Sequence, residues 1–162
     1  MLNLGARDIG VRRTSGWTSF TQQEVSDFGR TTRDEAPFHM DPEWARRHSP
    51  YGTTIAYGFQ TLAMLTYFNH ELFGWPADGT KDEGYGINYG IDRVRFTGPV
   101  PVGARFRCHM TLAGIEERNP GERKLTFKVE IEVEGMQRPV LVADWIGMFV
   151  VAEGHASLSR RV

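Results

Sequence analysis

Apolar and polar residues alternate strictly from Leu125 to Val133, where five apolar side chains are separated by threonine, lysine and glutamate. A period of two predicts a strand with one face buried and the other in water. Residues 104–113 alternate in the same way, and Gly121 marks a turn between these two segments. Residues 140–151 are apolar at odd- and even-numbered positions alike, which predicts a central strand covered on two faces.

The segment 54–73 has a helical pattern instead, with one glycine, no proline and apolar side chains on nearly every face. A helix of this kind must be wrapped on most sides. The segment 74–86 is dense in glycine, proline and charge, which predicts a long surface loop. A curled antiparallel β-sheet around one long apolar helix satisfies both patterns, and this α+β architecture is the hot-dog fold. The pattern alone leaves a generic α+β sandwich as the alternative.

Two shorter helices are predicted upstream of the long one. Thr21 and Glu24 form a capping box, so a helix starts near residue 22. In the pair Asp41-Pro42, the aspartate can cap a second helix, and the proline suits the first helical position, where no backbone N–H is needed. This second helix should run to about Arg47.

Length and charge narrow the class of protein. The 162 residues are the size of one domain, which we expect to span residues 1–162. With 19 basic and 20 acidic residues, the chain has no extended positive potential that would attract nucleic acid or an anionic membrane. We therefore expect its partner to be a small molecule or a protein. Cys108 is the single cysteine, and no segment resembles a signal peptide or a membrane span. We expect a cytoplasmic protein.

The segment 31–45 holds the residues most suited to chemistry. Asp34 and His39 share a short, proline-bent stretch between two predicted helices, where a carboxylate and an imidazole can converge. Such a pair can hold one water and move two protons, which is general acid–base catalysis. The alternative is that Asp34 caps a turn and His39 is a surface histidine.

Asp34, Pro37 and His39, followed by Asp41-Pro42 and Ala45, resemble the D-x-N-P-x-H-x-D-P pattern of the MaoC-like and (R)-specific enoyl-CoA hydratase family. The resemblance spans roughly residues 9–107 and implies the hot-dog fold, with Asp34 and His39 as the catalytic pair. Further segments look like the NodN-like branch of this family: Ser15-Gly16-Trp17, Thr21-Gln22, Tyr57-Gly58, Asn88 to Phe96, and Pro99 to Gly103.

The resemblance also implies how the thioester carbonyl is held. Negative charge develops on that oxygen during hydration, and the family stabilises it with a backbone N–H at the start of the long helix, which corresponds to Gly58. Gly58 could instead relieve crowding between helix and sheet. The chain departs from the pattern at Ala36, where the family has asparagine, and at Tyr57, where it has histidine. Tyr57 can still donate a hydrogen bond.

The remaining candidates for substrate binding follow the helix. The resemblance places Asn88 and Tyr89 with Tyr57 at the substrate. Arg93 and Arg95 are two residues apart, so on a strand they point to the same face. They could contact the phosphates of coenzyme A, or could form ordinary surface ion pairs. No metal is expected, because His39, Asp41 and His48 lack a third ligand at compact spacing and the family needs none.

The implied activity is an (R)-specific hydratase or dehydratase that acts on 2-enoyl or 3-hydroxyacyl thioesters of coenzyme A or acyl carrier protein, in fatty acid metabolism. No cofactor is implied beyond the thioester itself. A homodimer is expected, because the unpaired edges of the sheet need to be covered.

The first alternative is a hot-dog thioesterase, but Glu71, the only acid in the long helix, lies about three and a half turns from Gly58. The second is a non-catalytic subunit that binds acyl groups or completes a heterodimer.

Overall fold

The computed structural model of the protein describes residues 4–74 and 84–150. The long loop predicted at 74–86 lies mostly outside these ranges, and its last two residues belong to a strand instead. In chain order the elements are a 3-10 helix (Ala6–Asp8), β1 (Arg12–Thr14), α1 (Gln22–Thr32), α2 (Pro37–Met40), α3 (Pro42–His48), α4 (Gly58–Ala63), α5 (Leu65–Phe73), β2 (Tyr85–Phe96), β3 (Phe106–Asn119), β4 (Glu122–Val133) and β5 (Leu141–Val150).

The five strands form one sheet in the order β1-β3-β4-β5-β2, and every neighbouring pair is antiparallel. β4 confirms the alternation predicted from Leu125 to Val133, because the odd-numbered residues are buried and the even-numbered ones are more exposed. Gly121 lies in the turn between β3 and β4 with a φ of 83°, a left-handed conformation that favours glycine. β3 continues to Asn119, beyond the predicted end, because it pairs with β4 as far as that residue.

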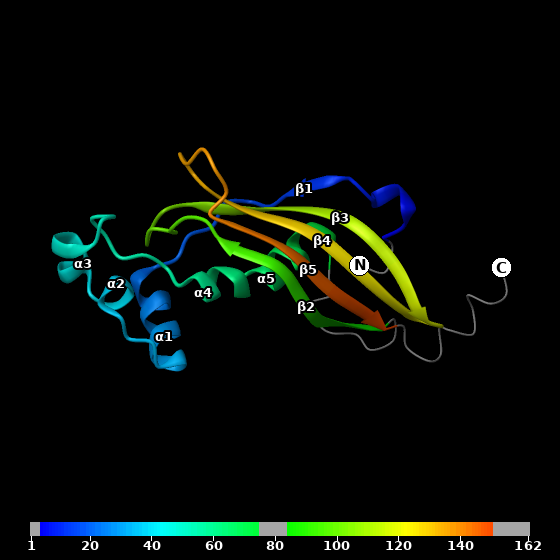
Figure 1. Cartoon of the computed structure of the whole chain (residues 1–162), viewed down its shortest axis with the longest axis horizontal. Coiled ribbons are helices and arrows are strands. Elements are labelled where there is room, and N and C mark those ends of the chain that lie inside the picture. The colour runs from blue at the N-terminus through cyan, green and yellow to red at the C-terminus, as the bar shows by residue number, and fades with distance from the viewer. Residues whose placement is uncertain (1–3, 75–83, 151–162) are drawn as a thin grey trace.

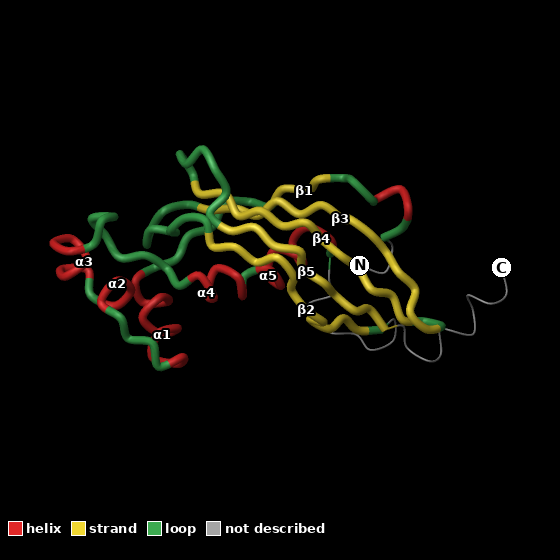
Figure 2. The backbone as a smooth tube through the Cα atoms, in the orientation of Figure 1, coloured by secondary structure: helices red, strands yellow, loops and turns green. Residues whose placement is uncertain are grey.

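The helices α4 and α5 lie along the concave side of this curled sheet, and α1 to α3 gather beyond one end (Figures 1 and 2). Side chains of both layers meet in the core, where Phe68 of α5 lies 6.0 Å from Phe106 of β3 between ring centroids. The described residues contain a single sheet, so the hot-dog arrangement is confirmed over a sandwich. No helix in the described ranges is long and apolar enough to cross a membrane.

Both short helices are confirmed, but the long one is not continuous. The capping box of Thr21 is present, and Asp41 caps α3 by accepting a bond from the backbone of Trp44 at 2.9 Å. Residues 54–57 are not helical, because the N–H groups of Ile55 and Ala56 donate to carbonyls in other segments. A turn at Met64 then divides the remaining helix into α4 and α5.

Within one chain, the sheet covers only the inner face of the two helices. That face is buried against the sheet, whereas Phe59 and Tyr67 on the outer face are 70% and 51% exposed. The second face of β5 is also only partly covered, since Val142 and Ile146 are half-buried. The physical reason is that a single layer of helices can cover only one face of one sheet.

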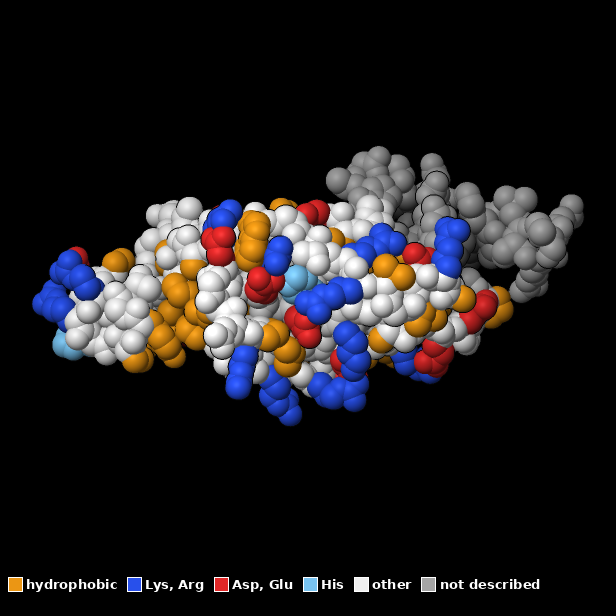
Figure 3. Space-filling model, turned by 90° about the horizontal axis from the view of Figure 1, so that it is seen from above, with side chains coloured by type: hydrophobic (Ala, Val, Ile, Leu, Met, Phe, Trp, Pro, Cys, Tyr) orange, Lys and Arg blue, Asp and Glu red, His pale blue; other side chains and the backbone are white. Residues whose placement is uncertain are grey.

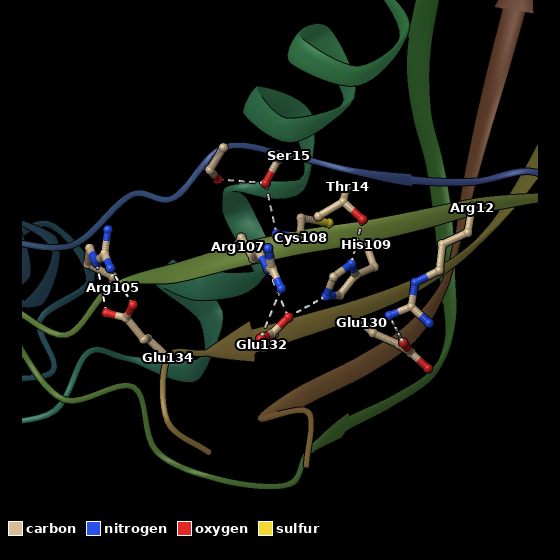
Figure 4. A network of polar contacts seen from close by, with 11 residues as sticks. Arg12, Thr14, Ser15, Arg105, Arg107, Cys108, His109, Glu130, Glu132 and Glu134 are labelled. Carbon is tan, nitrogen blue, oxygen red and sulfur yellow. Dashed lines mark hydrogen bonds and ion pairs between the residues drawn. The ribbon is translucent and has the colours of Figure 1, made fainter. Parts of the chain in front are cut away.

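The outer face of the sheet is bound together by charge pairs between strands (Figure 4). Arg12 of β1 contacts Glu130 of β4 at 2.8 Å, and Arg107 of β3 contacts Glu132 of β4 at the same distance. His109 joins this network through a 2.7 Å contact with Glu132. Acidic and basic side chains lie side by side on the surface seen in Figure 3. The polar face predicted for β4 is thus a partly exposed, charge-paired surface.

Candidate active site

The end of α1 turns the chain back sharply at the predicted catalytic segment. Arg33 adopts a left-handed conformation with a φ of 61°, and the backbone N–H of Asp34 then donates to Gly29 at 3.0 Å. The carboxylate of Asp34 accepts a bond from the backbone of Ala36 at 3.4 Å. Asp34 therefore does stabilise a turn, as the simpler interpretation predicted, while its side chain remains exposed.

His39 lies in the short helix α2 rather than in an irregular stretch, which corrects the sequence prediction. Proline at the first position of α2 favours this helical turn. The Nδ1 atom of His39 lies 2.7 Å from the carbonyl oxygen of Ile55. A carbonyl only accepts hydrogen bonds, so Nδ1 carries the proton and, in the neutral ring, Nε2 carries a lone pair. This tautomer presents Nε2 as a proton acceptor.

A chain of side-chain hydrogen bonds fixes the backbone beside the imidazole. Gln22 of α1 donates to the carbonyl of His39 at 2.7 Å, and Thr54 donates to the side chain of Gln22 at 2.6 Å. Neither Gln22 nor Ile55 was predicted from the sequence to belong to the site. Gln22 stands in a segment that resembles the family, but neither helix periodicity nor spacing shows that it reaches α2.

Tyr57 is the contact that joins the two predicted catalytic residues. Its hydroxyl donates to the backbone carbonyl of Asp34, and its ring stacks on His39 with 3.8 Å between centroids. The side chain is only 4% exposed. Burial raises the pKa of the Tyr57 phenol above its ordinary value, and the carboxylates of Asp34 and Glu35 raise it further. Tyr57 therefore remains a protonated donor at neutral pH.

Gly29 makes room for this arrangement, a role that was not predicted from the sequence. A Cβ atom at this position would lie 2.8 Å from the sulfur of Met40 and 2.9 Å from the carbonyl oxygen of Asp34, and it would also clash with the Tyr57 hydroxyl. Any larger residue would thus displace the contacts that hold Asp34 and Tyr57 together.

His39 and Gly58 line the same cavity, which has a volume of about 330 Å³. Gly58 is the first residue of α4, where the backbone N–H has no partner within its own helix. The ring of Phe96 covers it so closely that a Cβ atom at Gly58 would lie 2.9 Å from Phe96 Cδ1. Relief of crowding is therefore one role of this glycine. Asp34 is not among the described residues that line the cavity.

The other predicted substrate-binding residues lie elsewhere. Asn88 and Tyr89 line a second cavity of about 470 Å³ between α4, α5 and β2. A β-bulge between Asp92 and Arg95 interrupts the strand alternation. The prediction that Arg93 and Arg95 point to the same face assumed that this alternation is regular. Arg93, with a φ of 52°, pairs with Asp144, whose side chain is only 5% exposed, while exposed Arg95 donates to a neighbouring carbonyl at 2.7 Å.

Two remaining candidates are also placed by the structure. Glu71 accepts a hydrogen bond from the backbone of Gly16 at 2.6 Å, so the acid that a thioesterase would need holds the N-terminal segment against α5. In residues 4–74 and 84–150, no three His, Cys, Asp or Glu side chains are grouped so that they could hold a metal ion.

Fold and cavity together define a hot-dog protein with a histidine beside the start of its central helix. The chain belongs to the MaoC-like domain family, whose model matches residues 9–136. It is 42% identical to 3-hydroxyacyl-thioester dehydratase Z of Mycobacterium tuberculosis strain H37Rv, over 84% of this chain and 86% of that protein. It is 38% identical to nodulation protein N of Rhizobium leguminosarum bv. viciae, over 82% and 80%.

A solved structure shares the fold at low sequence identity. The (R)-hydratase from A. caviae involved in PHA biosynthesis superposes with a TM-score of 0.69 at 18% identity, over 89% of this chain and 98% of that one. The family resemblance drawn from the segment around Asp34 and from the NodN-like segments is thus confirmed.

Proposed function

We propose that the protein is a hydratase or dehydratase that interconverts 2-enoyl and (3R)-hydroxyacyl thioesters. The observation that carries this proposal is the fixed tautomer of His39 in a cavity shared with Gly58. An imidazole with a free Nε2 supplies the acid–base group, and the first N–H of α4 supplies a donor for the thioester oxygen. The family relationship, with a dehydratase among the relatives, supports the same reaction class.

The proposal requires the exposed carboxylate of Asp34, which does not line the cavity of His39 and Gly58, to turn toward that cavity. In the hydration direction, Asp34 and His39 then hold one water beside the β-carbon of the enoyl thioester. One of the two takes a proton from the water as the hydroxyl group bonds to the β-carbon, and the carbon–carbon π electrons move toward the carbonyl oxygen. The N–H of Gly58 and the dipole of α4 stabilise the resulting enolate. The proton is then delivered to the α-carbon, so dehydration is the same sequence in reverse. The two groups titrate as a coupled pair, and their roles need not be separable.

Tyr57 serves this reaction by position. It holds the Asp34 backbone and packs on the His39 ring, so it fixes the distance between the loop and α2. Misplacement of a catalytic group by about 1 Å can cost on the order of a hundredfold in rate. The reaction uses no cofactor, because coenzyme A or the acyl carrier arrives as part of the substrate.

The proposal is tested by the absorbance of the conjugated double bond of trans-2-enoyl-CoA on mixing with the purified protein. Loss of the band is expected, with a 3R product by chiral chromatography, and His39→Gln and Asp34→Asn should each lower turnover by about a hundredfold or more. His48→Gln is the matched control, since His48 is exposed on α3. Release of free thiol would identify a thioesterase instead, and no change in either signal would identify a scaffold.

A further inference from the structure

Gln22, the first residue of α1, connects this helix to two other segments beside the candidate site. Its Nε2 atom donates to the backbone carbonyl of His39 at 2.7 Å and to the hydroxyl of Ser26 at 3.2 Å, while its Oε1 atom accepts from Thr54 at 2.6 Å. A carbonyl oxygen only accepts hydrogen bonds, so the amide nitrogen must face His39. Gln22 is therefore a donor toward α2 and an acceptor toward the segment before α4.

These contacts close a ring around the imidazole of His39. Thr54 is followed directly by Ile55, whose carbonyl lies 2.7 Å from His39 Nδ1. From Gln22 the connection runs through Thr54 and Ile55 to the imidazole, and it returns to Gln22 through the backbone of His39. In a closed ring, the imidazole cannot move away from its carbonyl acceptor without breaking a hydrogen bond.

The ring is anchored to the fold on two sides. Thr54 is 2% exposed, and its backbone carbonyl accepts from Val102 at 2.9 Å. Gln22 lies in the first turn of α1, which is fixed by the capping box of Thr21. The side chain of Gln22 therefore extends from a well-defined position.

The third side of the ring is the weakest. α2, which carries His39, has four residues, and its N-cap position is occupied by Ala36, which has no polar side chain to cap it. A helix of one turn is not stable by itself, so its position depends on contacts with its neighbours. The bond from Gln22 to the His39 carbonyl is a contact of this kind.

We propose that Gln22 is a positioning residue that sets which ring nitrogen of His39 carries the proton. While the ring is closed, the Ile55 carbonyl keeps the proton on Nδ1 and leaves the lone pair on Nε2. Without Gln22, α2 shifts, the bond at Nδ1 lengthens, and the form protonated on Nε2 gains population. That form presents a donor where the reaction needs an acceptor. This kinetic consequence rests on the proposed function, whereas the change of tautomer does not.

The tautomer is measured by the nitrogen NMR chemical shifts of the imidazole rings at a pH of about 8, where an ordinary imidazole is neutral. His39 should be protonated on Nδ1 in the wild-type protein and should shift toward the Nε2 form in Gln22→Met, which fills similar space without the amide. His39→Gln identifies the signals by their loss, and His109 on the outer face is the internal reference. A wild-type ring protonated on Nε2, or an unchanged His39 in folded Gln22→Met, would overturn the proposal.

Gln23→Met is the matched control. Gln23 is the adjacent, exposed glutamine, and it donates to Asp27 within α1 at 2.8 Å. In the hydration of trans-2-enoyl-CoA, Gln22→Met should lower kcat about tenfold with little change in KM, because the imidazole is misplaced and the cavity is not. Gln23→Met should leave both constants unchanged. A loss confined to KM in Gln22→Met would contradict a role through His39.

Thr54→Val opens the same ring from its other side and removes only a hydroxyl group, so it also serves if Gln22→Met does not fold. It should move the His39 tautomer in the same direction. The double variant should lose no more kcat than Gln22→Met alone, and losses that multiply would show that the two residues act separately. Should no enoyl thioester react, the proposed function fails, and the tautomer in Thr54→Val decides the role of the ring. A shift supports that role, and an unchanged tautomer refutes it.

Discussion

At the scale of single residues, Tyr57 replaces the histidine of the family pattern and takes a central position. It connects two residues of the candidate site that are held by different segments, α2 and the loop after α1. This is a hydrogen bond together with a ring contact, and the two can be separated by substitution. The ring provides packing, whereas the hydroxyl fixes the backbone of Asp34.

Tyr57→Phe should therefore lower kcat about tenfold while KM changes little, because the ring remains and only the placement of Asp34 loosens. The free energy of unfolding should fall by about 1 kcal/mol, the typical net contribution of one hydrogen bond. Steady-state kinetics and urea denaturation measure the two effects. Tyr67→Phe, at an exposed tyrosine of α5, is the control. Unchanged kcat in Tyr57→Phe would show that the hydroxyl does not position the site.

At the scale of elements, local patterns predicted β3, β4 and β5 and the short helices α1 and α3, but not β1 or α2. The alternation from Leu125 to Val133 and the capping box at Thr21 are properties of adjacent residues, so the sequence displays them directly. The interruption of the long helix, in contrast, depends on contacts with distant residues. Residues 54–57 leave the helix because Ile55 and Ala56 pair with Phe38 and Val100, and no local pattern shows those partners.

The candidate site, too, could be predicted from the sequence only in part. The segment from Asp34 to His39 could be recognised by its spacing, but the Asp34–Tyr57 bond joins positions 23 residues apart. The space left by Gly29 for Tyr57 likewise depends on how separate elements pack. The bulge at Arg93 also changes the direction of side chains without a local signal. Tertiary contacts decide each of these features.

The charge network on the outer face should make stability depend on pH through Glu132. Hydrogen bonds from Arg107 and then from His109 lower the pKa of its carboxyl group. A depressed folded-state pKa stabilises the protein above the ordinary glutamate value of about 4.3, and this contribution is lost as the pH falls through the lowered pKa.

Glu132→Gln should therefore lower the free energy of unfolding by up to about 1 kcal/mol at neutral pH. The difference from the wild-type protein should narrow as the solution is acidified below pH of about 4. Chemical denaturation over a pH series measures this, with Glu117→Gln, at an exposed position of β3, as the control for loss of one charge. A difference that stays constant across the acid range would contradict the prediction.

At the scale of the whole molecule, the two edges of the sheet are unequal. β1 is three residues long and carries Arg12 and Arg13, and short charged edges resist pairing. β2 is twelve residues long, and its exposed side chains include Tyr85, Ile87 and Ile91. Phe59 and Tyr67 extend this apolar surface across the outer side of the helices. An exposed apolar surface of this kind typically marks an interface.

We therefore predict a homodimer in which β2 and the outer helix face are covered by a second copy. Light scattering at micromolar concentration should give twice the chain mass of 18.4 kDa. Ile87→Lys should shift the protein toward the monomer, because it places a charge on the edge that pairs, as natural proteins do to block such contacts. Ile9→Lys is the control, since Ile9 has similar exposure near β1. A wild-type mass of 18.4 kDa, or dissociation by Ile9→Lys rather than Ile87→Lys, would show that β2 is not the interface.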